Sequence, residues 1–321
     1  MRIALIGYGH VGRAFASLLD QKRSRYPFRI VAIHTARHGT AIDPSGLPPA
    51  PAFQTHLRGV DEFLDRAGCD VAAEISTLNP ETGEPALTHI RSAFARRRHV
   101  ITANKGPIAH AYASLVEEAR NAGVQFRFEA TVMDGTPLFN MVRKNLPGVK
   151  VRGFTGVLNS TSKVVIAAMR EGKTLEEGVA IAQSLGIAEA DPSYDLDGWD
   201  SAAKTAALAN VLMDARTTPR GVDRQGIGAF TAEQVRGLAE QGKTVSLISR
   251  GVTTPDGVRL SVHPEILRDT DMLATVQGTS NLILLDTDLM GTIGTVSISP
   301  GVEQTAYGLF SDLVDIVETT S

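Results

Sequence analysis

The sequence has few of the features that mark disulfide-rich, membrane or nucleic-acid-binding proteins. One cysteine, Cys69, occurs in 321 residues, so no disulfide can form within the chain, which suits a reducing cytoplasm. No apolar run reaches the roughly 20 residues that span a bilayer, and we expect no signal peptide at the start. A net charge of -3 argues against nucleic acid or a membrane as the main partner. We therefore expect a cytoplasmic protein whose main partner is neither nucleic acid nor a membrane.

The first part of the chain alternates between short apolar segments and segments with helical spacing. A length of 321 residues suits two domains, and strands that alternate with helices are typical of a parallel sheet. We therefore predict an α/β, Rossmann-type dinucleotide-binding domain over residues 1–131. Residues 38–56 hold many prolines and are expected to form a loop or an irregular crossover. The expected strands are 2–6, 28–35, 69–76, 99–104 and 124–132.

The pattern changes after residue 131. Residues 132–298 are predicted to form an α+β substrate domain with an antiparallel or mixed sheet. The expected strands are 150–159, 257–267, 273–287 and 291–300, and the clearest helices are 174–186 and 198–215. The segment 299–321 holds an amphipathic helix, about 303–318, whose apolar stripe needs a buried partner. We expect this helix to complete the first domain.

The opening segment carries the glycine spacing of a phosphate-binding turn. Gly7, Gly9 and Gly12 follow an expected strand and open an expected helix. The first glycine permits a tight turn, the second lets backbone approach a pyrophosphate, and the third lets helix and strand pack closely. The helix N-terminus then presents N–H groups to the phosphates. The segment predicts dinucleotide binding through these glycines and the neighbouring His10 and Val11; the alternative is a glycine-rich turn without a ligand.

The end of the second expected strand bears on cofactor choice. An acidic residue there would bind the ribose 2′-hydroxyl of NAD, but this chain has Thr35 near that position and Arg37 just after it. A guanidinium can pair with the 2′-phosphate of NADP. We therefore predict NADP over NAD, although Arg37 as a solvated loop residue remains the alternative. The other candidate cofactor contacts are Ser76, Thr77, Asn104 and Lys105.

Carboxylates gather in the second half of the chain. Glu189, Asp191, Asp195, Asp197 and Asp200 fall within twelve residues and precede Lys204. Such a run is usually a solvated loop and an acid-rich helix start. Asp200 and Lys204 are, however, four residues apart and share one face if the segment is helical. Lys105 is a second candidate, because it follows an expected strand at its carboxyl end, where open α/β sheets bind ligands.

These residues carry a resemblance to the homoserine dehydrogenase family, which extends over essentially the whole chain. The acid-rich segment is its most specific part, and no ACT or aspartate kinase domain accompanies it. The matching segments, in family order, are "LIGYGHVGRAF", "NPETGEPALTHI", "HVITANKGP", "FEATVMDGTP", "GVLNSTSKVVI", "AEADPSYDLDGWDSAAKTAALAN" and "GVEQTAYGLFSDLVDI". The family interconverts L-homoserine and L-aspartate 4-semialdehyde with NAD(P) in threonine, methionine and isoleucine biosynthesis.

The resemblance also implies roles for individual residues. It places Lys105 and Lys204 at the reacting oxygen, and it assigns Glu189 and Asp200 to the substrate amino group, with Asp200 also orienting Lys204. It further implies a homodimer and a monovalent cation, Na⁺ or K⁺. The cation would be bound by the backbone carbonyls of Glu129, Val132, Asp134 and Thr136. The chemistry agrees, because a cationic lysine stabilises the negative charge that develops when an aldehyde is reduced.

Two segments depart from the family pattern. Lys163 and Val164 replace a neutral amide and an aromatic residue, and Met133 and Asp134 fill a glycine-rich turn. These departures keep two alternatives open. One is a dehydrogenase of the same fold that acts on another small amino-acid alcohol or aldehyde. The other is a non-catalytic dinucleotide-binding sensor, against which the presence of Lys105, Glu189, Asp200 and Lys204 speaks.

Overall fold

The computed structural model describes residues 1–54 and 57–320. The chain forms two compact units, one made of Met1–Asn140 together with Gly301–Ser321 and the other of Met141–Pro300. Both contain a mixed six-stranded sheet and helices, and the first sheet is largely parallel, which confirms the predicted α/β class. Within the described residues no helix is both long and apolar enough to cross a membrane.

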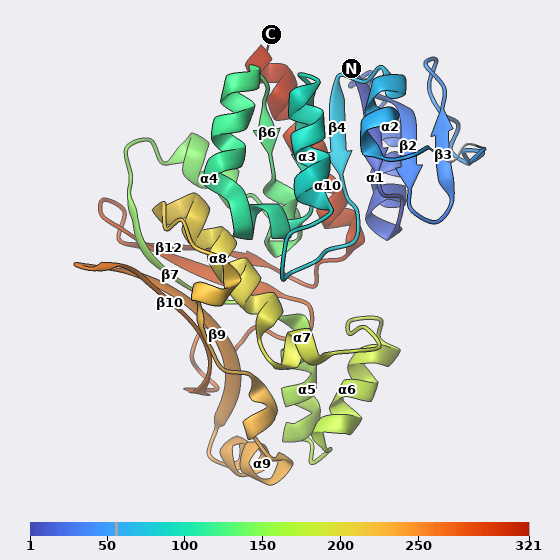
Figure 1. Cartoon of the computed structure of the whole chain (residues 1–321). Coiled ribbons are helices and arrows are strands. Elements are labelled where there is room, and N and C mark those ends of the chain that lie inside the picture. The colour runs from blue at the N-terminus through green and yellow to red at the C-terminus, as the bar shows by residue number, and fades with distance from the viewer. Residues whose placement is uncertain (55–56, 321) are drawn as a thin grey trace. The chain divides into compact units, whose positions relative to one another are not determined.

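The first unit is built on a sheet with the strand order β3-β2-β1-β4-β5-β6. All neighbouring pairs are parallel except β2 and β3. Helices α3 and α4 lie together on one face, and α1 and α10 pack against each other on the opposite face (Figure 1). The strands are β1 (Arg2–Ile6), β2 (Arg29–Thr35), β3 (Gly39–Ile42), β4 (Val71–Glu74), β5 (His99–Thr102) and β6 (Phe126–Arg127), and the helices are α1 (His10–Gln21), α2 (Val60–Ala67), α3 (Ala86–Ala95), α4 (Lys105–Ala122) and α10 (Val302–Thr320).

The C-terminal helix α10 shares the core of the first unit. Leu309 and Leu313 are fully buried in the same apolar cluster as Leu5 of β1 and Phe15 of α1. Phe310 adds an edge-to-face contact with Tyr26, with 5.2 Å between ring centroids. The apolar stripe of α10 therefore has the buried partner that amphipathic spacing requires.

Three predictions for the first unit need correction. The proline-rich segment contains a strand, β3, because its prolines begin at Pro44, after the strand has paired with β2. The strand predicted over 124–132 is only Phe126–Arg127, and 3₁₀ turns follow it. The first unit also continues past residue 131 to Asn140. Its last residues are tied back because the buried Glu129 carboxylate accepts the N–H groups of Leu138, Phe139 and Asn140 at 2.5, 2.9 and 2.7 Å.

The second unit is built on a sheet with the strand order β12-β11-β7-β9-β10-β8. Its pairs are antiparallel except β8 and β10. Residues 273–280, expected to belong to a long strand, lie outside the sheet, because pairing of that strand begins at Asn281. The strands are β7 (Val151–Val157), β8 (Asp223–Arg224), β9 (Lys243–Thr254), β10 (Gly257–Arg268), β11 (Asn281–Thr287) and β12 (Thr292–Ser297), and the helices are α5 (Ser160–Arg170), α6 (Leu175–Ser184), α7 (Ser193–Leu196), α8 (Trp199–Met213) and α9 (Ala232–Glu240).

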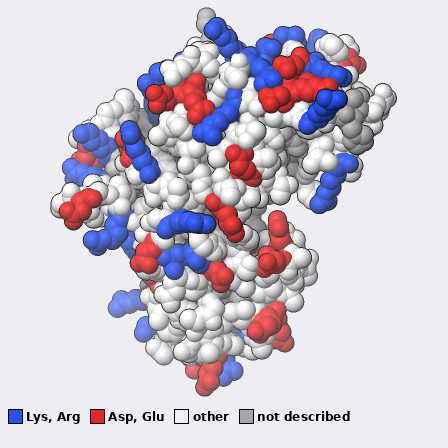
Figure 2. All heavy atoms as spheres, viewed as in Figure 1, with Lys and Arg blue, Asp and Glu red and all other residues white. Residues whose placement is uncertain are grey.

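Helix α8 packs on one face of the second sheet. It contacts β7, β9 and β10, and its alanines at 202, 203, 206, 207 and 209 are buried. Small side chains let the helix lie close to the strands, so the polar residues of its first turn are held at a fixed place. Charges of both signs are interspersed on the molecular face seen in Figure 2.

Candidate active site

The three glycines of the opening segment have distinct environments. Gly7 has a φ of +104°, and a Cβ there would collide with the carbonyl oxygen of Ile75. A Cβ on Gly9 would meet nothing within 4 Å, whereas one on Gly12 would lie 3.0 Å from Cδ1 of Ile75. Gly7 therefore permits the turn, Gly9 leaves open space beside the start of α1, and Gly12 permits close packing. This open cradle at a helix N-terminus fits a pyrophosphate.

The turn after β2 presents Arg37 to solvent. Arg37 is exposed between β2 and β3. The Thr35 hydroxyl accepts the N–H of His38 at 2.9 Å and lies 3.3 Å from the carbonyl oxygen of Gly39. Thr35 thus holds the turn together. No carboxylate stands between residues 35 and 38 to repel a phosphate.

The loops after β4 and β5 hold the other candidate cofactor residues of the first unit. Ser76 is half-buried and Thr77 is exposed. Asn104 is the N-cap of α4, because its side-chain oxygen accepts the N–H of Gly106 at 3.1 Å. Lys105, half-buried, is the first residue of that helix. Both loops follow carboxyl ends of neighbouring parallel strands, where such sheets bind ligands.

The predicted cation ligands lie in two consecutive 3₁₀ turns, η1 (Glu129–Thr131) and η2 (Met133–Gly135). Met133 and Asp134 have φ values of +57° and +53°, so two non-glycine residues adopt a left-handed conformation that L-amino acids rarely adopt. Val132 and Thr136 flank η2. The segment therefore forms a tight, irregular pair of turns.

In the second unit, Asp200 and Lys204 form the pair expected from their spacing. Lys204 Nζ lies 3.0 Å from Asp200 Oδ2, and the two side chains are 20% and 18% exposed. Nζ also donates to the carbonyl oxygen of Leu158 at 2.6 Å. Leu158 lies directly after β7, so a helix residue and a strand end fix the position of the ammonium group.

Asp195, one of the five gathered carboxylates, belongs to the same cluster, although the sequence analysis assigned it no role. Its Oδ1 accepts from Asn159 Nδ2 at 2.6 Å, and its Oδ2 accepts from the Thr161 hydroxyl at 2.8 Å. Asn159 Nδ2 also lies 3.2 Å from Asp200 Oδ2 and so bridges the two carboxylates. Asn159 caps α5 through the N–H of Ser162. An asparagine before "STS" is a helix-start pattern, and this signal could have identified Asn159 as the N-cap of α5.

The electrostatics of the cluster are set by burial and by the neighbouring carboxylate. Burial raises the pKa of Asp195, and repulsion from Asp200 raises it further. Hydrogen bonds from Thr161 and Asn159 and the charge of Lys204 oppose this shift. The ammonium group of Lys204 is therefore held between Asp200 and the carbonyl oxygen of Leu158. This arrangement is able to present the ammonium group to a substrate oxygen.

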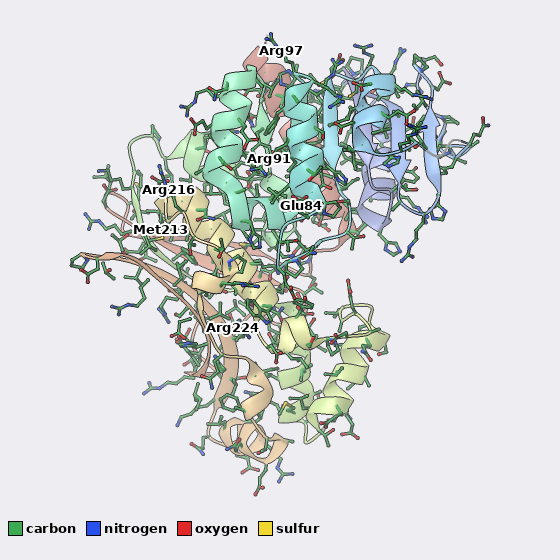
Figure 3. All side chains as sticks on the ribbon, in the orientation of Figure 1. Glu84, Arg91, Arg97, Met213, Arg216 and Arg224 are labelled. Atoms are coloured by element: carbon green, nitrogen blue, oxygen red, sulfur yellow. The ribbon has the colours of Figure 1, made fainter. Side chains whose placement is uncertain are left out.

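The start of α8 is fixed from the adjacent strand. Arg224, labelled in Figure 3, stacks its guanidinium 3.9 Å from the ring centre of Trp199 and donates to the carbonyl oxygen of Asp197. Gly198 has a φ of +80° at the N-cap. These contacts set the direction in which α8 leaves its turn, and with it the position of Asp200.

Glu189 is the first carboxylate of the acid-rich segment. It is exposed in the segment between α6 and α7, and its backbone carbonyl accepts from Gln183 Nε2 at 3.0 Å. Asp191 also differs from the clustered carboxylates, since hydrogen bonds from Ser193 lower its pKa.

The substituted residues Lys163 and Val164 have structural partners of their own. Lys163 Nζ donates to the carbonyl oxygen of Ser280 at 2.5 Å, and Val164 is buried. Lys163 thus binds the segment that leads into β11, whereas Asn159 and Thr161 of the same motif bind Asp195.

Comparison with known proteins covers both units. A homoserine dehydrogenase family model matches residues 137–314, and the NAD-binding domain model of homoserine dehydrogenase matches residues 7–129. The chain is 35% identical to the homoserine dehydrogenase of Methanocaldococcus jannaschii, with 100% of this chain and 99% of that protein covered. It is 33% identical to an NAD(+)-dependent homoserine dehydrogenase of Pseudomonas canavaninivorans, with 100% and 97% covered. The crystal structure of a homoserine dehydrogenase from Thiobacillus denitrificans has a TM-score of 0.86 at 26% identity, with 100% and 74% covered.

Proposed function

The chain belongs to the homoserine dehydrogenase family, and from this premise we propose how its residues divide the work of the reaction. The protein is an oxidoreductase that interconverts L-homoserine and L-aspartate 4-semialdehyde with a nicotinamide dinucleotide. The proposal rests on one observation, the ammonium group of Lys204 held between Asp200 and the carbonyl oxygen of Leu158.

Lys204 acts on the substrate oxygen. Reduction of an aldehyde places negative charge on that oxygen, which a nearby ammonium stabilises and protonates. Asp200 orients Lys204 and favours its charged form, and Lys105 is the second lysine that we assign to catalysis. Glu189, exposed in this structure, binds the substrate amino group.

The open turn at Gly7–Gly12 and the loops at Ser76–Thr77 and Asn104–Lys105 hold the cofactor. When bound, the nicotinamide gives or accepts the hydride. NADP is preferred over NAD, because Thr35 stands near the position where NAD-binding proteins of this fold place an acidic residue, and Arg37 just after it can pair with a 2′-phosphate. One relative is named as NAD(+)-dependent, so the cofactor preference of this chain is to be measured directly.

The segment 129–136 binds Na⁺ or K⁺ through carbonyl oxygens of Glu129, Val132, Asp134 and Thr136. This assignment is supported by the left-handed backbone at Met133 and Asp134. A cation held there would stabilise a turn whose conformation is otherwise costly.

The protein forms a homodimer through the sheet of the second unit. Val252 and Val296 lie on the sheet face opposite α8 and are 44% and 50% exposed. Exposed apolar residues on a sheet face are suited to a second copy of the same face.

Steady-state oxidation of L-homoserine tests the function. Purified protein is mixed with the substrate and NADP, then NAD, and the absorbance of the reduced cofactor is followed. We expect turnover with both and a higher kcat/KM with NADP. Binding of cofactor without turnover of homoserine would contradict the catalytic roles, and a higher kcat/KM with NAD would contradict only the cofactor preference.

A further inference from the structure

A buried carboxylate lies at the end of β4 and takes no part in the roles assigned above. Glu74 is 1% exposed. Its Oε1 accepts the N–H of Ser76 at 3.1 Å and the Ser76 hydroxyl, and it lies 3.3 Å from His89 Nδ1. A buried charge is costly without such donors. The contacts from Ser76 and His89 are therefore what allows this carboxylate to be buried.

A second arm of the same network leads to the neighbouring loop. The Thr102 hydroxyl at the end of β5 lies 2.9 Å from the backbone oxygen of Glu74 and 3.3 Å from its Oε2. The same hydroxyl accepts the N–H of Asn104 at 2.9 Å. Asn104 in turn caps the helix that begins with Lys105. One carboxyl side chain thus connects the loop after β4 with the loop after β5.

We propose that Glu74 is a positioning residue that holds the loops at Ser76 and at Asn104–Lys105 in the conformation that binds the dinucleotide. This inference rests on the proposed cofactor site, because both loops belong to it. Glu74 itself acts through Ser76 and Thr102. The strands of a sheet are rigid, whereas the loops at their ends are flexible. A strand-end side chain that binds both loops holds them in place, so cofactor binding has to order less of the chain.

The alternative is that Glu74 only stabilises the first unit. The hydrogen-bond pattern around Glu74 lets substitutions distinguish a positioning role from a requirement for charge. Glutamine at position 74 keeps an acceptor for Ser76 and His89, and its amide can donate to the Thr102 hydroxyl. Aspartate keeps the charge but is one methylene shorter, so its carboxylate is withdrawn from Ser76. Positioning therefore predicts that glutamine replaces glutamate better than aspartate does, and a requirement for charge predicts the reverse order.

The test is fluorescence titration of NADPH and NADH into wild type, Glu74→Gln and Glu74→Asp, together with thermal melts and steady-state kinetics. We expect Glu74→Asp to raise Kd and the cofactor KM by at least about tenfold and Glu74→Gln by less than about threefold. At saturating cofactor, kcat should change less than KM. Glu118→Gln is the matched control, since Glu118 pairs with Arg91 on the surface and is 37% exposed. It should leave Kd unchanged.

Two further variants keep the result decisive. Ser76→Ala removes one arm directly, and Thr102→Val removes the other, and each should raise Kd when Glu74 is intact. Equal Kd values for wild type and both Glu74 variants would overturn the inference, as would tighter binding by Glu74→Asp than by Glu74→Gln. In either case normal wild-type binding would leave the cofactor site standing. A wild-type protein that bound neither reduced cofactor would overturn both.

Discussion

Replacement of Lys204 by alanine should separate the catalytic role of this residue from its structural one. General acid catalysis is typically worth a factor of about 10²–10⁴, which corresponds to about 2.7–5.5 kcal/mol of barrier at 1.36 kcal/mol per tenfold change. We therefore expect Lys204→Ala to lower kcat by such a factor. Cofactor affinity should be nearly unchanged, because Lys204 is assigned to substrate and not to the dinucleotide.

The same change has a cost in stability that must be measured separately. Lys204 Nζ and Asp200 Oδ2 are 3.0 Å apart and about a fifth exposed. Breaking a buried ion pair costs about 3–5 kcal/mol, and solvent screening at a partly exposed pair lowers this to about 1–3 kcal/mol. Without Lys204 the pKa of Asp195 should rise further, since the lysine charge opposes the upward shift.

The assay combines initial rates, NADPH titration and urea unfolding, with an added amine as a probe. A primary alkylamine that enters the space left by Lys204 should restore part of kcat in Lys204→Ala. Lys243→Ala, a lysine change at the start of β9 in the same unit, is the matched control and should not respond to amine. A kcat near that of wild type, with only the stability loss, would refute the catalytic assignment and leave the pair as a structural ion pair.

Three further outcomes are expected. Arg37→Ala should weaken NADP by about 1.5–3 kcal/mol, the value of a hydrogen bond to a charged group, and NAD far less; equal losses in titrations of both cofactors would show that Arg37 does not contact the 2′-phosphate. Glu189→Gln should mainly raise KM for homoserine at unchanged kcat in steady-state kinetics, because binding of the amino group is the same in ground and transition states; a fall in kcat alone would contradict this. Burial and Asp200 raise the pKa of Asp195 above the ordinary 3.8. The protonated form of Asp195 therefore contributes to the free energy of unfolding at pH values below 3.8, and this contribution is lost as the pH rises through the raised pKa. Asp195→Asn should remove this loss, which urea unfolding at a series of pH values would detect as a flatter profile.

The sequence predicted the parts of the fold that carry a strong periodic or glycine signal. The parallel sheet and the amphipathic α10 follow from alternation and from the apolar stripe. Strand β9 was missed because its centre is buried on both faces, with Thr244 to Ser249 all buried, so period-two alternation is absent. Helix α5 was missed because "STSKVV" is rich in β-branched and hydroxyl residues that favour other conformations.

The candidate site was predictable only where spacing along one element sufficed. Asp200 and Lys204 meet because four residues make about one helical turn. Asp195 joins them through Asn159 and Thr161, which are more than thirty positions away in the sequence, and no local pattern encodes that contact. Glu189 stands near Asp191 and Asp195 in the sequence, yet it is exposed in the irregular segment between α6 and α7.

The division of the first unit between the two ends of the chain has a consequence for synthesis. Residues 141–300 form a continuous segment and leave the ribosome before α10 does. All strands of the first sheet are synthesised early, but Leu309, Phe310 and Leu313 of α10, which pack in the core of this unit, are synthesised last. Domains generally fold as units during translation, so the later segment can finish folding before the earlier one. Until then an apolar sheet face of the nascent chain is open to chaperones and proteases.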